Sequence, residues 1–381
     1  MLRRARWVGP LLVSVVVLSA CSSSGTGSKT PTTATAGPSR STTTFSAPSS
    51  TTTTSTTPTT PQPNLTLAVE PADQYGSINQ MIRSSRRSLD MAMYELSDPR
   101  VSILLVSAHR RGVAVRVLLD DTGGAAAINQ SSYTELQTHG VPVRWAPTSV
   151  TFHQKSVTTD HTEVAVMTGN LTSTYYPTTR DFVVFDRSPA ALRSVESVFN
   201  RDWNGSATNR VPTVAGLVWS PGARAALVGL INSAHHTLAV ENEEMAAPAI
   251  ISALKAASHR GVLVTVTMTY SPAWKAAWTG LTRAGVEVST YPDIPTAMLI
   301  HAKAMVVDDL TGFVGSQNFS NAGLAHNREL GVITSDAAIV GPLSQTLAAD
   351  FAGGTRFKIR VPTVTSTTHT TVATTVTTKA P

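Results

Sequence analysis

Residues 153–160 read HQKSVTTD and residues 301–308 read HAKAMVVD, so the pattern His-x-Lys-x4-Asp occurs twice in this chain of 381 residues. The second copy begins 148 positions after the first (301 − 153 = 148). Because the chain has only seven lysines and ten histidines, two copies in matched register are not a product of composition. The repeat predicts two similar halves that bring both copies to one shared site.

The residue types in the repeat suit a phosphodiester. His153 and Lys155 are two positions apart, as are His301 and Lys303, so on a strand each pair projects from one face. The lysines supply positive charge without a metal or a cofactor. One neutral histidine can attack phosphorus while the other, protonated, donates to the leaving oxygen.

Two further positions repeat at the same offset of 148, namely Asn170 with Asn318 and Asp181 with Glu329. The Asn side chains offer amide donors. Each acidic residue lies 28 positions after a histidine, where it can hold the Nδ1 proton and direct Nε2 at the phosphate. The pattern therefore predicts a two-step displacement through a phosphohistidine, with no metal and no cofactor.

The duplicated pattern, followed by Gly315-Ser316-x-Asn318 in the second copy, resembles the phospholipase D superfamily over roughly residues 70–350. The resemblance implies two α/β halves, each a mixed sheet flanked by helices, packed with pseudo-two-fold symmetry around one active site. It also implies that His153 is the nucleophile and His301 the general acid.

The resemblance further assigns the residues that bind the phosphoryl oxygens, which are Lys155, Lys303, Asn170, Asn318, Thr168 and Ser316. It makes Asp160 and Asp308 structural. The first copy departs from the family pattern, because Met167-Thr168-Gly169-Asn170 stands where Gly-Ser-x-Asn is expected. Thr168 still offers a hydroxyl at the Ser position.

The ends of the chain have the composition of targeting and spacer segments. Residues 1–20 carry a basic head and a short apolar run, which are typical of a secretory signal peptide. The sequence Leu18-Ser19-Ala20-Cys21 resembles a bacterial lipobox and predicts lipid attachment to Cys21, the chain's one cysteine. A plain signal peptide or a retained anchor is the alternative. We expect an exported protein, anchored by lipid on the outer face of the cell membrane or secreted.

Residues 21–64 are rich in Ser, Thr and Pro and cannot bury enough apolar surface to fold, so we expect a disordered stalk. Residues 362–381 repeat this composition and are expected to be a disordered tail. The folded part then comprises a first half at 65–210 and a second half at 211–361.

The charge of the folded part argues against a nucleic-acid partner. The whole chain has 30 basic and 24 acidic residues, but six of the basic residues lie outside 65–361, which leaves 24 of each sign. Sequence-independent nucleases draw their affinity from a basic surface. We therefore expect a phospholipid or membrane surface as the partner, and a monomer.

Alternating helices and Val-rich strands predict a layered α/β fold in both halves. Matching Arg-Gly-Val triplets at 111–113 and 260–262 indicate equivalent helix ends. Helices are expected at 76–87, 99–111, 129–139, 188–202, 221–234, 247–260, 272–284 and 336–350. Strands are expected at 88–95, 113–120, 141–145, 163–168, 181–186, 237–243, 262–269, 286–290, 311–315 and 329–334, and around His153 and His301.

Several other residues have two interpretations. Glu95 and Glu243 end matched strands, where they either approach the site or pair with surface charges. Asp120-Asp121 lacks further ligands at metal spacing, which favours a capping role. The aromatic residues Trp274, Trp278, Tyr175 and Tyr176 either line a lipid entrance or pack in the core, and the two tyrosines are the better candidates for the rim of the site.

The function expected from these observations is hydrolysis of a glycerophospholipid to phosphatidate and a head-group alcohol. Three alternatives remain open: phosphatidyl transfer to an alcohol, as in cardiolipin synthases; a secreted endonuclease of the same superfamily; and an inactive surface-binding lipoprotein.

Overall fold

The computed structural model describes residues 64–206, 211 and 214–359. The expected signal peptide, the lipidation of Cys21, the stalk up to residue 63 and the tail at 362–381 lie outside these residues. Among the helices that are described, none combines the length and the hydropathy needed to cross a membrane.

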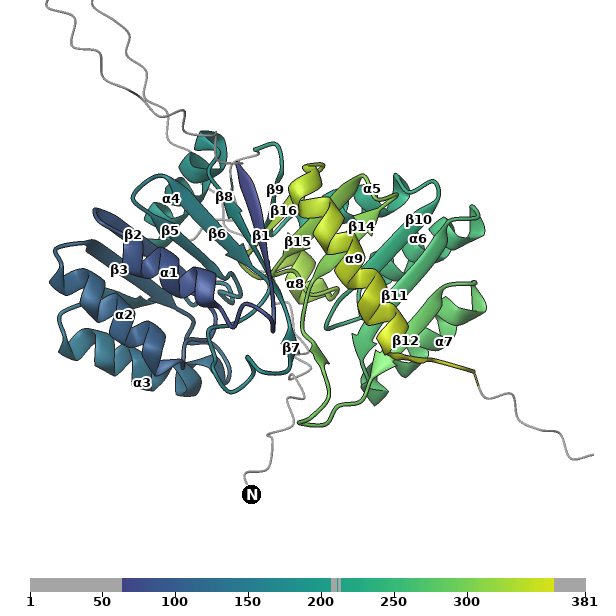
Figure 1. Ribbon diagram of the computed structural model, residues 1–381, viewed down its shortest axis with the longest axis horizontal. Helices are drawn as coiled ribbons and strands as arrows, with labels where there is room; N and C mark the ends of the chain where they lie inside the picture. Colours follow the sequence, from purple (N-terminus) through teal and green to yellow (C-terminus); the bar gives the residue numbers. More distant parts are fainter. Residues whose placement is uncertain (1–63, 207–210, 212–213, 360–381) are drawn as a thin grey trace, which may run out of the picture. The chain divides into compact units, whose positions relative to one another are not determined.

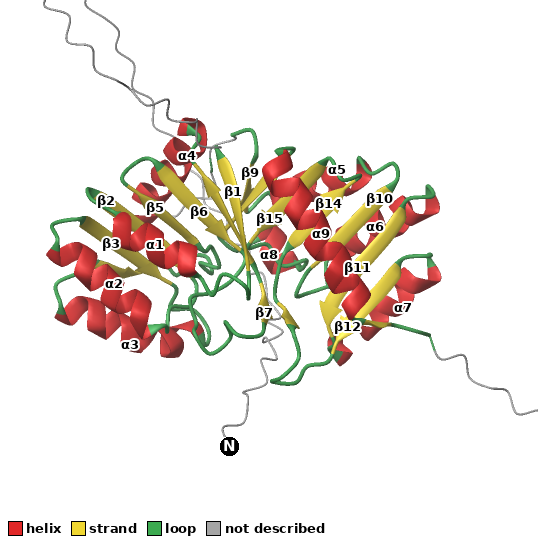
Figure 2. Ribbon diagram, viewed as in Figure 1, coloured by secondary structure: helices red, strands yellow, loops and turns green. Residues whose placement is uncertain are grey.

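The first half is a seven-stranded sheet in the order β1-β8-β6-β5-β2-β3-β4, with helices on both faces (Figures 1 and 2). Its strands are β1 (Leu65–Val69), β2 (Ser88–Met93), β3 (Ala114–Leu119), β4 (Val143–Trp145), β5 (Ser156–Thr159), β6 (Glu163–Met167) and β8 (Phe182–Asp186). Its helices are α1 (Gly76–Ser84), α2 (Pro99–Arg110), α3 (Ala125–Thr138) and α4 (Pro189–Trp203).

The second half is an eight-stranded sheet in the order β17-β12-β11-β10-β14-β15-β16-β9. Its strands are β9 (Leu217–Ser220), β10 (Thr237–Glu241), β11 (Leu263–Thr269), β12 (Glu287–Tyr291), β14 (Ala304–Val307), β15 (Thr311–Gly315), β16 (Glu329–Thr334) and β17 (Thr355–Arg356). Its helices are α5 (Ala223–Asn232), α6 (Pro248–His259), the 3₁₀ turn η1 (Pro272–Trp274), α7 (Lys275–Arg283), α8 (Asn321–Ala325) and α9 (Ala337–Gly353).

Both sheets are mixed, and in the same way. In the first half β2, β3 and β4 run parallel while β5, β6 and β8 continue antiparallel. In the second half β10, β11 and β12 run parallel while β14, β15 and β16 continue antiparallel. The prediction of two similar mixed-sheet α/β halves is therefore confirmed.

Strand β2 shows why the residues form these layers. Leu89, Met91 and Met93 are buried in one core cluster with residues of α1 and α2, whereas Ala92 points to the other face and packs near Phe199 of α4. Burying each large apolar side chain contributes about 1.5–3 kcal/mol. A strand covered on both faces therefore reads as nearly continuous apolar sequence.

The helix ends follow local chemistry. Helix α2 begins where Asp98 accepts a hydrogen bond from the Arg100 amide and Pro99 takes the first helical position. It is followed by Gly112 with φ +87°, and α6 is followed by Gly261 with φ +91°. Glycine adopts this left-handed conformation without strain, so the matching Arg-Gly-Val triplets do mark equivalent helix ends.

The two halves share a core. Val164, Val166 and Val184 of β6 and β8 belong to the same buried cluster as Val314 and Leu330 of β15 and β16. The backbone also pairs between the halves, because the short strand β7 (Thr179–Arg180) runs parallel to β13 (Leu299–Ile300). These contacts fix the position of one half against the other.

Two predictions about the strands were wrong. His153 and His301 do not lie within strands, because β5 begins at Ser156 and His301 falls between β13 and β14. Both histidines instead occupy the extended segments that enter these strands. Strands β1, β7, β9, β13 and β17 were not predicted from the sequence, because they pair with segments distant in sequence or belonging to the other half and so leave no local pattern.

Candidate active site

Each histidine of the repeat contacts the acidic residue of the other half. His153 Nδ1 lies 2.9 Å from Glu329 Oε2, and His301 Nδ1 lies 3.0 Å from Asp181 Oδ1. The sequence suggested that each acid serves the histidine 28 positions before it. In the structure each acid instead contacts the histidine of the other half, so neither half forms a complete histidine–acid pair by itself.

Backbone contacts between the halves explain why each histidine meets the acid of the other half. Phe152, just before His153, forms a bridge with Arg328, just before Glu329. In the same way the His301 amide donates to the Arg180 carbonyl at 3.3 Å, one residue before Asp181. The segment entering each histidine therefore lies beside the segment entering the opposite acid.

Two buried ion pairs tie the halves together around these segments. Arg180 of the first half pairs with Asp350 of α9, and Arg328 of the second half pairs with Asp202 of α4, with an N–O distance of 3.1 Å in each pair. The two pairs are repeats of each other, since 328 − 180 and 350 − 202 both equal 148. These ion pairs were not predicted, although an arginine directly precedes Asp181 and Glu329 and the aspartate partners recur at the same offset.

The lysines of the repeat lie beneath the histidines with no exposed surface. Lys155 Nζ donates to the His153 carbonyl at 2.7 Å, and Lys303 Nζ donates to the His301 carbonyl at 2.5 Å. Tyr94 covers the first pair, with its ring centroid 4.5 Å from the His153 ring and 5.0 Å from Lys155 Nζ. Burial lowers the pKa of Lys155 to about 7, although the negative charge of Glu329 acts to raise it.

The surroundings of His153 favour its neutral form. Burial, and then the positive charges of Lys155 and Lys303, lower the pKa of His153 well below its ordinary value. A neutral imidazole that donates its Nδ1 proton to Glu329 keeps a lone pair on Nε2. Burial also raises the pKa of Glu329 to about 7, with Lys155 opposing the rise. The ionised form of Glu329 is the one that can accept this proton.

The acid beside His301 behaves differently. Burial raises the pKa of Asp181, but the charge and hydrogen bond of His301 outweigh it and hold the pKa below its ordinary value. A carboxylate that stays ionised suits a histidine that carries a proton. The two histidines therefore have unlike environments, as an acid and a nucleophile require.

Asn170 contacts a glutamate of the site, and both asparagines of the repeat have a buried side-chain oxygen. Asn170 Nδ2 donates to Glu95 Oε2 at 3.0 Å, and the Oδ1 atoms of Asn170 and Asn318 are buried without a hydrogen-bond partner. Buried acceptors of this kind mark places where a ligand donor or an ordered water completes the structure.

Thr168 and Ser316 lie elsewhere than expected. Both are fully buried behind the acids: Thr168 Oγ1 donates to Asp181 at 2.6 Å, and Ser316 Oγ accepts from the Leu330 amide at 3.1 Å. In this structure their hydroxyls support the acid-bearing strands instead of facing a ligand. The resemblance alone assigned them to the phosphate, because position in a motif does not show which way a hydroxyl points.

Asp160 and Asp308 have the structural role expected. Asp160 accepts hydrogen bonds from the backbone amides of residues 86–88, and Asp308 does the same for residues 235–237. These amides open β2 and β10, so each aspartate joins the repeat motif to the central strand of its half. Both aspartates have a positive φ, 54° and 52° respectively, which Asp tolerates better than most residues.

Glu95 and Glu243, which the sequence left open, both lie at the site. They are also repeats of each other, since 243 − 95 = 148. Glu95 contacts Asn170, whereas Glu243 Oε2 lies 3.1 Å from Lys303 Nζ and 3.5 Å from His301 Nε2.

The remaining candidates have structural contacts. Asp120 accepts hydrogen bonds from Thr122 and from the Phe152 amide, which is a capping role. Trp278 is fully buried in the core of the second half. Tyr176 is also buried, with its ring centroid 4.6 Å from that of Tyr75, so of the two tyrosines expected at the rim only Tyr175 is exposed.

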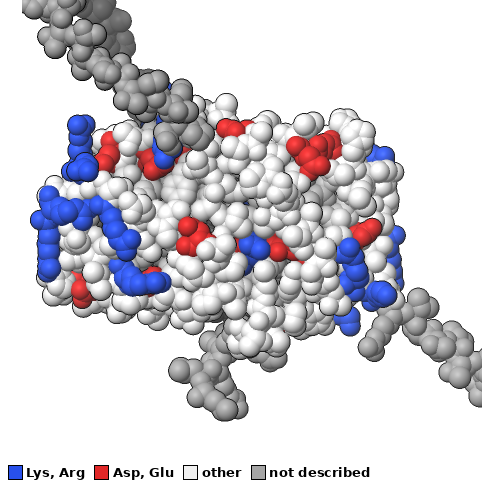
Figure 3. All heavy atoms as spheres, in the orientation of Figure 1, with Lys and Arg blue, Asp and Glu red and all other residues white. Residues whose placement is uncertain are grey.

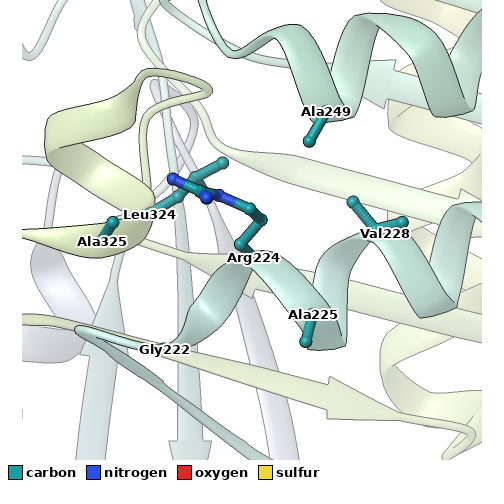
Figure 4. A pocket seen from close by; sticks show the side chains of 7 residues that line it. All are labelled: Gly222, Arg224, Ala225, Val228, Ala249, Leu324 and Ala325. Atoms are coloured by element: carbon teal, nitrogen blue, oxygen red, sulfur yellow. The ribbon is translucent and has the colours of Figure 1, made fainter.

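A surface hollow in the second half lies apart from this constellation (Figure 4). Ala225, Val228, Ala249 and Leu324 line it, and the Arg224 side chain, which donates to Asn321 at 2.6 Å, lies across it. It contains none of the repeated residues, so the chemistry belongs to the histidine constellation.

Comparison with known proteins agrees with this geometry. A family model described as "Cardiolipin synthase, PLD-like domain" matches residues 78–203 and again residues 227–352. The chain therefore belongs to this family of phospholipase D-like domains and carries two copies of the domain.

Among curated relatives, cardiolipin synthase A of Pseudomonas aeruginosa is 30% identical over 138 residues, which is 34% of this chain and 27% of that protein. The mitochondrial cardiolipin hydrolase of Xenopus laevis is 28% identical over 119 residues, 31% of this chain and 56% of the relative. The chain thus spans about a quarter of the synthase and just over half of the hydrolase.

Two solved structures share the fold. Phosphatidylserine synthase of Haemophilus influenzae has a TM-score of 0.59 at 12% identity, covering 76% of this chain and 86% of its own. Polyphosphate kinase of Porphyromonas gingivalis has a TM-score of 0.57 at 13% identity, covering 75% of this chain and 50% of its own. At these identities the likeness concerns the arrangement of both halves and not their chemistry.

Proposed function

We propose that the protein is a phospholipase D-type phosphodiesterase that hydrolyses a glycerophospholipid to phosphatidate and a head-group alcohol. One observation carries the proposal: two imidazoles, each held by a carboxylate of the opposite half, converge with two buried lysines. This arrangement provides a nucleophile, an acid and positive charge for one phosphoryl group.

The first step uses the unlike environments of the two histidines. His153 Nε2 attacks phosphorus, the bond from phosphorus to the head-group oxygen breaks, and His301 gives its proton to that oxygen. Lys155 and Lys303 offset the charge on the non-bridging oxygens. The product is a phosphohistidine, and the alcohol leaves.

The second step reverses the roles. His301, now neutral, takes a proton from a water molecule, whose oxygen attacks the phosphohistidine. The bond from phosphorus to His153 Nε2 breaks, which releases phosphatidate and restores both histidines. Asp181 stabilises the proton that returns to His301.

Two observations favour a lipid over a nucleic acid. The folded part has no excess of basic residues, and in Figure 3 Lys and Arg gather at the two ends of the visible face, with mostly uncharged surface between them. The named relatives are a cardiolipin synthase and a cardiolipin hydrolase, and both names refer to a phospholipid. The proposal includes export and a lipid anchor at Cys21, which would hold the domain near its substrate.

Transfer to an alcohol is the second candidate, and the match to a cardiolipin synthase family model favours it. Water and an alcohol compete for the same phosphohistidine, so the two reactions differ in the acceptor and not in the residues described. Added glycerol separates them, because a transferase forms phosphatidylglycerol at the expense of phosphatidate.

The test is a substrate panel on the full chain and on His153→Ala, with EDTA present. We expect the wild type to release phosphatidate from phosphatidylcholine or phosphatidylglycerol micelles. An acid-labile phosphoenzyme should form in the wild type and in His301→Ala. His153→Ala should give neither phosphatidate nor the phosphoenzyme. Cleavage of plasmid DNA without lipid turnover would identify an endonuclease instead. Lipid binding without turnover of any substrate would identify a surface-binding protein.

A further inference from the structure

Glu243 contacts two groups that the proposed mechanism assigns to the phosphodiester. Its Oε2 lies 3.1 Å from Lys303 Nζ and 3.5 Å from His301 Nε2. These are the cation proposed to contact the phosphoryl group and the atom proposed to protonate the leaving oxygen. In the free protein this carboxylate therefore holds the groups that a phosphodiester must engage.

The repeat makes Glu243 unlike its counterpart. Glu95 is buried and contacts Asn170, and burial raises its pKa. For Glu243 burial also raises the pKa, but the positive charges of Lys303 and His301 outweigh it and hold the pKa below the ordinary range. A negative charge thus lies beside His301, whereas its counterpart Glu95 contacts Asn170 and burial works against its charge.

A substrate has to displace the Glu243 carboxylate from Lys303, and the displaced carboxylate stays within the site. The Glu243 side chain is 40% exposed, whereas the Lys303 side chain is fully buried, so the glutamate is the partner with freedom to rotate. A phosphodiester carries one negative charge and competes for Lys303. The displaced carboxylate then remains beside His301, on the side from which the leaving alcohol departs.

We propose that Glu243 is a specificity-determining residue that favours a phosphodiester whose leaving alcohol carries a positive charge, such as the ammonium of a zwitterionic phospholipid. This inference rests on the proposed function and on His301 as the acid. A cationic head group balances the displaced carboxylate and draws it away from the phosphate. A neutral head group offers no such balance, and a second phosphate in the head group is repelled.

The experiment compares phosphatidylcholine with phosphatidylglycerol, each diluted to the same small mole fraction in neutral detergent micelles so that surface charge stays constant. We expect the wild-type chain to prefer phosphatidylcholine in kcat/KM. Glu243→Gln should lower the ratio between the two lipids by about 10–150-fold, the usual range for one hydrogen bond to a charged group. The variant should also gain rate on phosphatidylglycerol, which a merely damaged site would not do.

Glu244→Gln is the matched control. It removes a neighbouring carboxylate that is hydrogen-bonded by Ser320 and does not contact Lys303 or His301. We expect the lipid ratio of this variant to stay within about twofold of wild type, because no contact of Glu244 with Lys303 or His301 has to be broken by the phosphate.

A second measurement does not depend on turnover. Without the competing carboxylate, Glu243→Gln should bind inorganic phosphate about tenfold more tightly in a calorimetric titration. If wild type hydrolyses both lipids but Glu243→Gln changes neither the ratio nor phosphate binding, the inference is wrong and the proposed function stands. If wild type hydrolyses neither lipid, the proposed function fails and this inference fails with it.

Discussion

Replacing Glu329 by Gln tests the crossed pairing of the two halves. Glu329 has no exposed surface. Its Oε2 accepts from His153 at 2.9 Å, its Oε1 accepts from Asn327 at 3.0 Å, and the Ser316 side chain also donates to this carboxylate. A glutamine has the same shape but only one acceptor oxygen. At least one of these donors must therefore lose its partner.

The size of the effect depends on which donor loses its hydrogen bond to residue 329. A hydrogen bond to a charged group contributes about 1.5–3 kcal/mol, which corresponds to about 10–150-fold in rate. If the glutamine amide instead faces His153 Nδ1, it stabilises the tautomer with the proton on Nε2, and the loss approaches about 10⁴-fold. We therefore expect formation of the phosphoenzyme to slow by between about 10-fold and 10⁴-fold.

Bis(4-nitrophenyl) phosphate provides the assay, because its phenolate leaves with little need of a proton and reports the first step as a burst. Glu329→Gln should slow the burst. Asp181→Asn should leave the burst nearly intact and slow the steady state, because the second step needs His301 as a base. The two variants thus separate the histidines by role.

The chain contains its own control. His161 Nδ1 lies 2.7 Å from Glu196 Oε1 in an exposed pair with the same chemistry. Glu196→Gln should leave both phases within about twofold of wild type, since exposed ion pairs contribute little. An unchanged burst in Glu329→Gln, together with a slowed burst in Asp181→Asn, would show that His301 is the nucleophile and refute the assignment.

Three further predictions concern pH, the buried ion pairs and packing. Glu329 must be ionised and Lys155 charged, and both pKa values are about 7, so kcat/KM should follow a narrow bell near neutrality. The arginine of Lys155→Arg keeps its charge at high pH, so the alkaline limb of the pH profile of this variant should shift to higher pH. Arg328→Met should lower the free energy of unfolding by about 3–5 kcal/mol in denaturant titrations, because it leaves the Asp202 carboxylate buried without its partner. Burial already raises the pKa of Asp202 to about 6, so stability is lost as pH rises through that value, and the deficit should be smaller at pH 5 than at pH 8. Gly169→Ala should reduce turnover, because a Cβ there meets the Tyr75 hydroxyl and the Asp181 carboxylate, whereas Gly229→Ala, where a Cβ meets nothing, should not alter the rate.

The sequence alone determined the features that depend on spacing and on residue type. The offset of 148 identified two halves, the equivalent positions of His153 and His301, and the asparagines and acids that accompany them. The apolar strands and the glycine helix ends followed from local patterns, which is why most elements of both halves were predicted in order. The expected chemistry also came from residue types, because paired imidazoles, ammonium groups and amides suit a phosphoryl group.

The tertiary structure decided which residues meet. The crossing of His153 to Glu329 and of His301 to Asp181 depends on backbone pairing between the halves, and such pairing leaves no periodic signal in either half. The different surroundings of Glu95 and Glu243 are also decided in space, since identical residues at equivalent positions acquire opposite pKa shifts from burial and from neighbouring charge. Burial and Coulomb interactions are set by distances in space, and a sequence gives only distances along the chain.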